Sequence, residues 1–166
     1  KRQILKNFKV DFVYLPSKKH VYHSKRLSKI KLNKTDQILC AKFRKGHFEG
    51  VIDVMDRLTN LIKPSRIFMG EKDMQQLYLV KNYIEKRYKS KIVSCPTIRD
   101  KKRFALSSRN LLLSNNQISK ARNLTNHLFN FKKRLKNKKN ILQVVQQKKN
   151  NLSKLFHIKV EYLELR

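Results

Sequence analysis

The chain has 166 residues, of which 40% are hydrophobic, enough to bury a core in one domain or two small ones. It carries 41 lysine and arginine residues against 11 aspartate and glutamate residues, for a formal charge of +30. No apolar run of about 18 residues occurs, and the first residues do not have the pattern of a secretory signal. The sequence therefore predicts a cytoplasmic protein with no membrane partner.

The excess of basic residues raises the question of nucleic acid, because lysine and arginine displace counterions from phosphate backbones. These residues are spread through every segment instead of gathering on one element, and no nucleic-acid-binding motif is recognisable. Lysine, asparagine and isoleucine have AT-rich codons, so genome base composition explains the bias without a ligand. We favour that explanation and keep a basic nucleic-acid-binding protein as an alternative.

The two cysteines, Cys40 and Cys95, lie far apart and have no second cysteine or histidine at metal-ligand spacing. They predict two reduced, buried side chains, with neither a disulfide nor a metal site.

The first half of the chain alternates predicted strands and helices. After the tail of a helix at residues 4–8, the β-branched and aromatic run 11–17 predicts a buried strand ended by a proline. Apolar residues then recur at helical spacing over 49–62, where Pro64 stops the helix. Residues 67–69 predict a second buried strand, with a glycine at its carboxyl end.

A second amphipathic helix is predicted from Met74, Leu77, Val80 and Ile84, followed by a third strand at 91–95. Strands alternating with helices predict an α/β fold with a parallel sheet, in which ligands bind beyond the carboxyl ends of the strands.

After Arg109 the sequence pattern changes to long helices. A capping box at Ser114–Gln117 opens a long amphipathic helix over 118–135, and a further helix is predicted at 141–152. Strict alternation over 158–162 predicts a half-exposed, antiparallel strand. We expect two domains, 1–96 and 97–166.

Three polar stretches carry candidate chemistry. The first is Gly70–Gln76, placed after a buried strand and opening a helix. Free backbone N–H groups and the positive end of the helix dipole favour anions there, and Lys72 adds a mobile positive charge. Asp73 suits ribose hydroxyls, and Gln76 lies one turn further on, facing the same side. The same residues are also common in an ordinary capped helix.

The second stretch contains Ser107, Ser108 and Arg109, whose hydroxyl and guanidinium groups together suit a polyphosphate. Taken alone, it is equally typical of a polar turn. In the third stretch, two glycines frame His47 just before a helix, and the spacing does not decide between a structural and a substrate-binding histidine.

The order of the three stretches along the chain decides between the functional and the ordinary structural interpretations. In that order they resemble the motifs of pantothenate synthetase (pantoate-beta-alanine ligase). That family carries Arg-Pro-Gly-His-Phe-x-Gly-Val, Gly-Glu-Lys-Asp-Tyr-Gln-Gln-Leu, Pro-Thr-x-Arg-Glu and Leu-Ala-Met-Ser-Ser-Arg-Asn. The counterparts here are 44–51, 70–77, 96–100 and 104–110, and the resemblance extends over essentially the whole chain. It implies a Rossmann-like, nucleotidylyltransferase (HUP-type) parallel sheet with a smaller α+β carboxyl-terminal domain, and a cytoplasmic homodimer.

The resemblance also implies the site and the reaction. The residues expected to contact ATP are Gly70, Glu71, Lys72, Asp73, Ile98, Leu106, Ser107, Ser108 and Arg109, with Ile98 using its backbone. Lys72 and Arg109 are the expected catalytic residues, Gln76 and His47 the expected substrate-binding ones, and Mg²⁺ accompanies ATP with no metal site on the protein. The expected reaction joins pantoate to β-alanine through a pantoyl adenylate, releasing AMP and pyrophosphate.

Several departures from the family pattern accompany the match. The family's Pro-Thr-Met-Gly-Ala-Leu-His-x-Gly-His and Phe-Val-Asn-Pro-x-Gln-Phe stretches have no counterpart, and we expect the last carboxyl-terminal strands of the family to be missing as well. We therefore expect an incomplete enzyme that is inactive alone, with an inactive or diverged relative as an alternative. Lys102 and Arg103 stand where the family often has Asp-Gly. This substitution predicts a more basic and less flexible loop in front of the phosphate-binding residues Leu106–Arg109.

Overall fold

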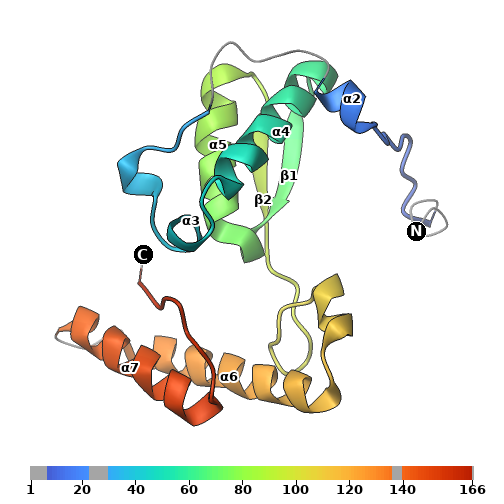
Figure 1. Cartoon of the computed structure of the whole chain (residues 1–166). Coiled ribbons are helices and arrows are strands. Elements are labelled where there is room, and N and C mark those ends of the chain that lie inside the picture. Colours follow the sequence, from blue (N-terminus) through green and yellow to red (C-terminus); the bar gives the residue numbers. More distant parts are fainter. Residues whose placement is uncertain (1–6, 23–29, 136–139, 166) are drawn as a thin grey trace.

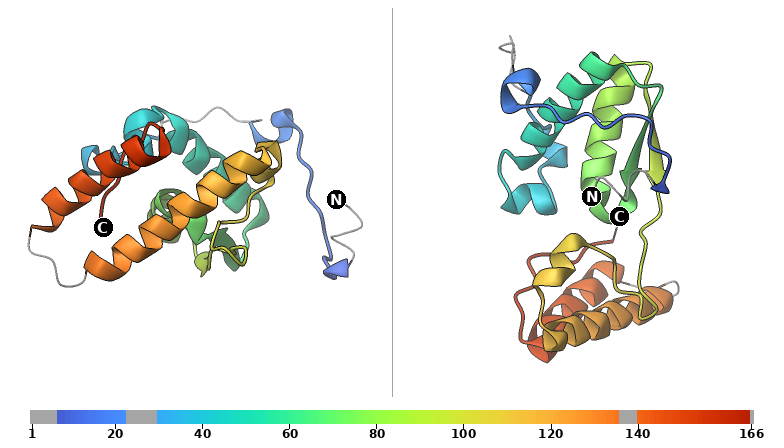
Figure 2. Two further views of the ribbon diagram at one scale, coloured as in Figure 1. Left: turned by 90° about the horizontal axis from the view of Figure 1, so that it is seen from below. Right: turned by 90° about the vertical axis from the view of Figure 1, so that its right-hand side faces the viewer.

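The computed structural model describes residues 7–22, 30–135 and 140–165. An α/β part comes first along the chain, and a pair of long helices follows it (Figure 1). An extended segment leads from the last strand of the α/β part down to these helices, as the right-hand view of Figure 2 also shows. In the described ranges, no helix combines the length and the apolar composition needed to cross a membrane.

In the part of the chain that the structure describes, the sheet consists of two parallel strands, β1 (Arg66–Gly70) and β2 (Lys91–Cys95). Gly70 is level with Cys95, so both strands end at the same edge. They are joined by α5 (Met74–Arg87), which packs on the sheet and beside α4 (His47–Ile62) (Figure 1). This strand–helix–strand unit is the predicted α/β arrangement, and its strand and helix positions are confirmed.

The core of this part lies between the two helices and the sheet. Val80 and Ile84 on α5 are fully buried, and Phe48 and Ile52 of α4 pack against the same cluster. Met74, which was predicted on the buried stripe of α5, is instead 56% exposed. Met74 is the first residue of α5, and at this end of the helix its side chain is not covered by the sheet.

The strand predicted at residues 11–17 is absent from the structure. This segment is extended but belongs to no sheet, and Phe12 is 91% exposed. A strand needs a neighbour for its N–H and C=O groups, and among the described residues none lies alongside. Of the predicted helical tail before it, Ile4 and Leu5 lie outside the described residues.

Among the described residues between this segment and α4, the structure forms three short elements. They are α2 (Lys18–Val21), capped by the Ser17 side chain, η1 (Lys34–Asp36) and α3 (Cys40–Phe43). Cys40 and Cys95 are free and half-buried, so the prediction of buried cysteines holds only in part.

The last part contains η3 (Ser108–Leu112), α6 (Asn115–Arg134) and α7 (Ile141–Phe156), and α6 packs on α7. Ser114 and Gln117 form the predicted capping box at the start of α6. The strand predicted at 158–162 is wrong, because this segment is extended without a strand partner in the part of the chain that the structure describes. It returns instead toward α3 (Figure 1).

Candidate active site

The first predicted stretch lies at the carboxyl edge of the parallel sheet. Directly after β1 the chain forms η2 (Glu71–Asp73), and α5 begins at Met74. This edge faces the α6 and α7 part of the molecule, as Figure 1 shows for the tip of β1. Parallel sheets bind their ligands at this edge, beyond the ends of the strands.

Lys72 and Asp73 are both exposed at this edge, and Gln76 is half-buried one helical turn further on. Asp73 is the N-cap residue of α5 but its side chain does not cap the helix. A side-chain carbon built onto Gly70 would meet nothing within 4 Å, so the space in front of it is open. The η2 turn and the start of α5 together therefore present a lysine, a carboxylate and helix N–H groups to open space.

Glu71 is bound to the neighbouring strand. Its Oε1 accepts a hydrogen bond from Ser94 Oγ at 2.6 Å. Because Ser94 is level with Met69 in the register, this bond joins the turn after β1 to the last residues of β2. Sequence reasoning missed this brace, since only the pairing of the strands brings the two residues together.

Gln75 holds a second segment against the start of α5. Its Nε2 donates to the carbonyl oxygens of Ile38 at 2.8 Å and Asp36 at 3.2 Å. The segment before α3 is thereby tied to the first turn of α5, which follows Lys72 and contains Gln76. The side chain of Gln75 is thus bonded within the fold, whereas its neighbour Gln76 is the residue predicted to bind substrate.

The second half of the predicted site is a hairpin. The backbone N–H of Leu106 donates to the carbonyl of Ile98 at 2.9 Å, and Arg99 and Ala105 form an antiparallel bridge. Ile98 is 68% exposed and Leu106 is 53% exposed. The backbone of Ile98, expected to contact adenine, therefore already accepts one bond within the hairpin.

Asp100 fastens this hairpin to α6. Its Oδ2 lies 2.8 Å from Nε and Nη2 of Arg122, and its Oδ1 accepts from the N–H groups of Phe104 and Lys102. Partial burial by itself would raise the pKa of Asp100, but the Phe104 N–H, the Arg122 guanidinium and the Lys102 N–H together hold its pKa below the ordinary value. The carboxylate is thus kept ionised.

Residues after the hairpin form the predicted hydroxyl and guanidinium turn. Ser107 is the N-cap of η3, and its Oγ accepts from the N–H of Arg109 at 3.3 Å. Ser108 and Arg109 are exposed. The three side chains thus belong to one short turn, as the sequence predicted, although part of the hydrogen-bonding capacity of Ser107 is used internally.

His47 is the first residue of α4. Gly46 before it has φ +76°, a left-handed conformation that glycine adopts readily and most other residues do not. The imidazole ring lies 5.0 Å from the ring of Phe48, which is buried. The left-handed turn at Gly46 therefore determines where His47 lies at the start of α4.

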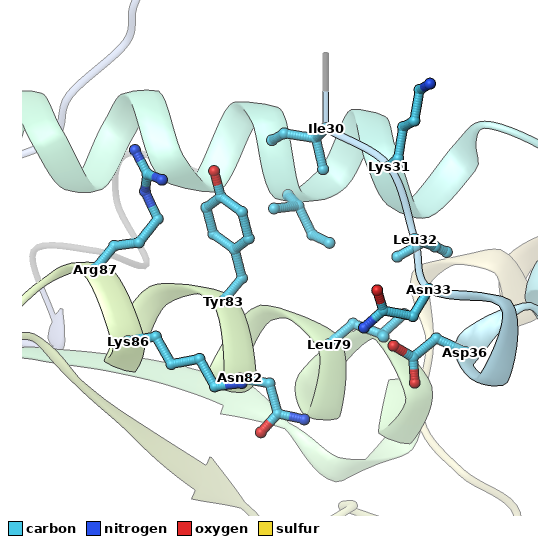
Figure 3. A pocket seen from close by; sticks show the side chains of 11 residues that line it. Ile30, Lys31, Leu32, Asn33, Asp36, Leu79, Asn82, Tyr83, Lys86 and Arg87 are labelled. Atoms are coloured by element: carbon cyan, nitrogen blue, oxygen red, sulfur yellow. The ribbon is translucent and has the colours of Figure 1, made fainter. Parts of the chain in front are cut away.

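Two cavities locate the open space around these elements. One of about 440 Å³ joins the turn after β1 to the hairpin and α6, and its lining consists of Glu71, Pro96, Thr97, Arg99, Leu128, Phe129 and Lys132. That lining does not include Ser107–Arg109. The other, of about 300 Å³, lies between the segment 30–36 and helices α4 and α5 (Figure 3). None of the predicted site residues lines it.

Parallel strands with a polar turn at their common carboxyl edge define a Rossmann-like α/β arrangement. The family model for pantoate-beta-alanine ligase matches residues 2–166. The chain therefore belongs to the pantoate-beta-alanine ligase family, which confirms the predicted resemblance and fold class.

Similar proteins agree with this assignment. A pantothenate synthetase of Caldicellulosiruptor saccharolyticus is 34% identical over 93% of this chain and 56% of its own length. The crystal structure of a pantoate-beta-alanine ligase from Francisella tularensis, complexed with beta-gamma ATP and beta-alanine, is 29% identical with a TM-score of 0.82, and covers 99% of this chain and 60% of that one. A pantothenate synthetase structure from Thermus thermophilus has a TM-score of 0.72 at 28% identity, over 94% of this chain and 54% of that one. The chain thus spans little more than half the length of these relatives.

Proposed function

We propose that this chain provides part of an ATP-dependent ligase that joins pantoate to β-alanine, forming pantothenate, AMP and pyrophosphate. The observation that carries the proposal is the turn at Gly70–Gln76, which combines the family motif with an open sheet edge at a helix N-terminus. The solved relative bound to ATP and β-alanine supports it.

In this proposal the phosphates of ATP lie against the first turn of α5. Lys72 neutralises phosphate charge there, Asp73 accepts hydrogen bonds from the ribose, and Gly70 and Glu71 line the approach. Glu71 does so mainly by bracing the turn to Ser94. The hairpin with Ile98 and Leu106 borders the adenine, and Ser107, Ser108 and Arg109 grip the phosphates from the other side.

The first chemical step is attack of a pantoate carboxylate oxygen on the α-phosphorus, which breaks the bond to pyrophosphate. In the second step the β-alanine amine attacks the activated carbonyl, loses a proton and expels AMP. Gln76 and His47 orient the acid substrates, and Lys72 and Arg109 offset the charge that develops on the phosphate oxygens. Positioning and electrostatics therefore supply most of the acceleration that we assign to the protein.

Magnesium enters this proposal with the nucleotide. Within the described ranges no three His, Cys, Asp or Glu side chains gather to form a metal cage. Mg²⁺ commonly binds through substrate phosphates with few protein ligands, which fits these residues. When bound, it would supply further charge neutralisation at the phosphates.

Binding of ATP to the purified chain tests the site directly. Lys72→Ala should weaken the affinity for ATP by about tenfold or more in a calorimetric titration, because it removes a charge-assisted contact to phosphate. Gln76→Ala should leave ATP affinity unchanged and lower pantoate affinity. Lys81→Ala is the matched control, at an exposed lysine on α5, the helix that follows the turn. Equal ATP affinities for Lys72→Ala and Lys81→Ala would contradict the proposed site.

The same variants separate the proposal from nucleic-acid binding. The charge of +30 predicts an affinity for RNA or DNA that falls steeply with salt. If that were the function, filter binding at two salt concentrations would give the same affinity for Lys72→Ala and for Lys81→Ala, and ATP would not compete.

We further propose from the family resemblance that the complete protein is a cytoplasmic homodimer. Sedimentation of the complete protein tests whether it is a dimer.

A further inference from the structure

The segment after α7 runs back across the molecule to the α/β part. The chain turns at His157, whose φ is +45°, and then rises toward α3 (Figure 1, and from the side in Figure 2). Lys149 of α7 donates from Nζ to the carbonyl oxygen of Glu161 at 2.8 Å. The segment 158–165 is thus fastened to the helix that it leaves.

At its far end Tyr162 contacts two residues of α3. Its hydroxyl lies 2.6 Å from Sγ of Cys40, and its ring stacks on Phe43 with the centroids 6.0 Å apart and the planes inclined by 20°. Cys40 and Phe43 are three residues apart on one helical turn, so both face the same tyrosine. Burial, followed by the bond to Cys40, raises the pKa of Tyr162 to about 12, so the hydroxyl stays protonated.

Helix α3 is itself held firmly in the α/β part. On one side Gln75 binds the carbonyl of Ile38, just before the helix. On the other side Arg44 N–H donates to the carbonyl of Cys40, and His47 N–H donates to that of Arg44 at 3.1 Å, at the start of α4. A side chain that fixes α3 therefore also fixes the turn that presents His47.

We propose that Tyr162 is a latch residue that holds the α6 and α7 part against α3 and, while engaged, shields the Cys40 thiol from reagents in solution. The ring and the hydroxyl have separate roles: stacking on Phe43 provides contact area, and the bond to Cys40 fixes the register. The latch is a property of the fold and does not depend on the proposed reaction.

The rate of thiol modification by Ellman's reagent reads out the state of the latch. In a Cys95→Ser background Cys40 is the only thiol of the chain. Tyr162→Phe keeps the stacking and removes the hydroxyl, so Cys40 should react about fivefold faster, as expected for the loss of one hydrogen bond. Tyr162→Ala also removes the stacking and should speed the reaction about thirtyfold. Tyr78→Ala, at a tyrosine that is 56% exposed on α5, is the matched control and should leave the rate unchanged.

The direction of the change distinguishes a latch from a local chemical effect. If the Tyr162 hydroxyl only stabilised the thiolate, its removal would slow the reaction, because the thiolate is the reactive species. A slower or unchanged rate in Tyr162→Phe would therefore overturn the proposal. Small-angle scattering on Tyr162→Ala provides a second measurement: release of the latch should increase the radius of gyration, while the circular dichroism of the helices stays the same. No increase in the radius would also count against a latch.

Discussion

The hydrogen bond between Glu71 and Ser94 gives the most direct test of how the candidate site is built. We consider the single variants Glu71→Ala and Ser94→Ala and the double variant. Hydrogen bonds to a charged group contribute about 1.5–3 kcal/mol to stability. Here Ser94 is exposed and Glu71 is half-buried, so water competes for both groups. We therefore expect a coupling free energy of about 1 kcal/mol, at or below the lower end of that range.

This coupling has consequences for stability and for the ligand. Each single variant should lower the free energy of unfolding by about 1 kcal/mol, and the double variant by little more than either, because both remove the same bond. Without the brace, the turn 71–73 must be ordered when ATP binds. The dissociation constant for ATP should therefore rise by up to about fivefold, the factor that corresponds to 1 kcal/mol.

Urea unfolding of the four proteins measures the coupling, and calorimetric titration with ATP measures its effect on binding. Ser119→Ala, at an exposed serine on α6, serves as the control for loss of a hydroxyl. Single-variant effects that add within about 0.3 kcal/mol would show that the two side chains do not interact. The brace would then have no part in positioning the turn.

Two further changes test the core and the hairpin. Ile84→Ala should lower the free energy of unfolding by about 2–5 kcal/mol in urea, since the side chain is fully buried; Leu111→Ala, 88% exposed, is the control, and similar losses for both would contradict the described core. Asp100→Asn should lower the melting temperature at neutral pH by weakening the bond to Arg122. Because folding lowers the pKa of Asp100, its contribution is complete above the unfolded pKa, near 3.8, and is lost as pH falls through the lowered folded pKa. The difference in melting temperature between the two proteins should therefore shrink in acid, and a constant difference would refute this account.

The elements that sequence reasoning predicted correctly are those determined by local signals. Apolar periodicity and the stop at Pro64 define α4, and the capping box at Ser114 defines the start of α6. Both strands of the sheet are short apolar runs, β1 ended by a glycine and β2 by a proline just beyond it. The polar turn after β1 followed from strand–helix order alone.

The wrong predictions concern features that depend on a partner in space. Residues 11–17 and 158–162 have strand-like composition, but a strand forms only when another lies beside it. The Glu71–Ser94 bond depends on the register of two strands, and the contact of Tyr162 with Cys40 spans 122 positions of sequence. No periodicity or motif in a single sequence encodes such pairs.

The structure of the hairpin explains how an arginine is accommodated at position 103, where the family often has glycine. Arg103 has φ +68°, in the left-handed region, where a residue with a Cβ is strained by about 1 kcal/mol and glycine is not. Its guanidinium lies over the ring of Phe129 at 5.4 Å, and Arg99 lies over the same ring at 5.1 Å. Cation–π contacts at such positions contribute about 0.5–1 kcal/mol each, which offsets the strain. Compared with a glycine, Arg103 makes the loop less flexible and attaches it to α6. Less of the loop therefore has to become ordered when a nucleotide binds.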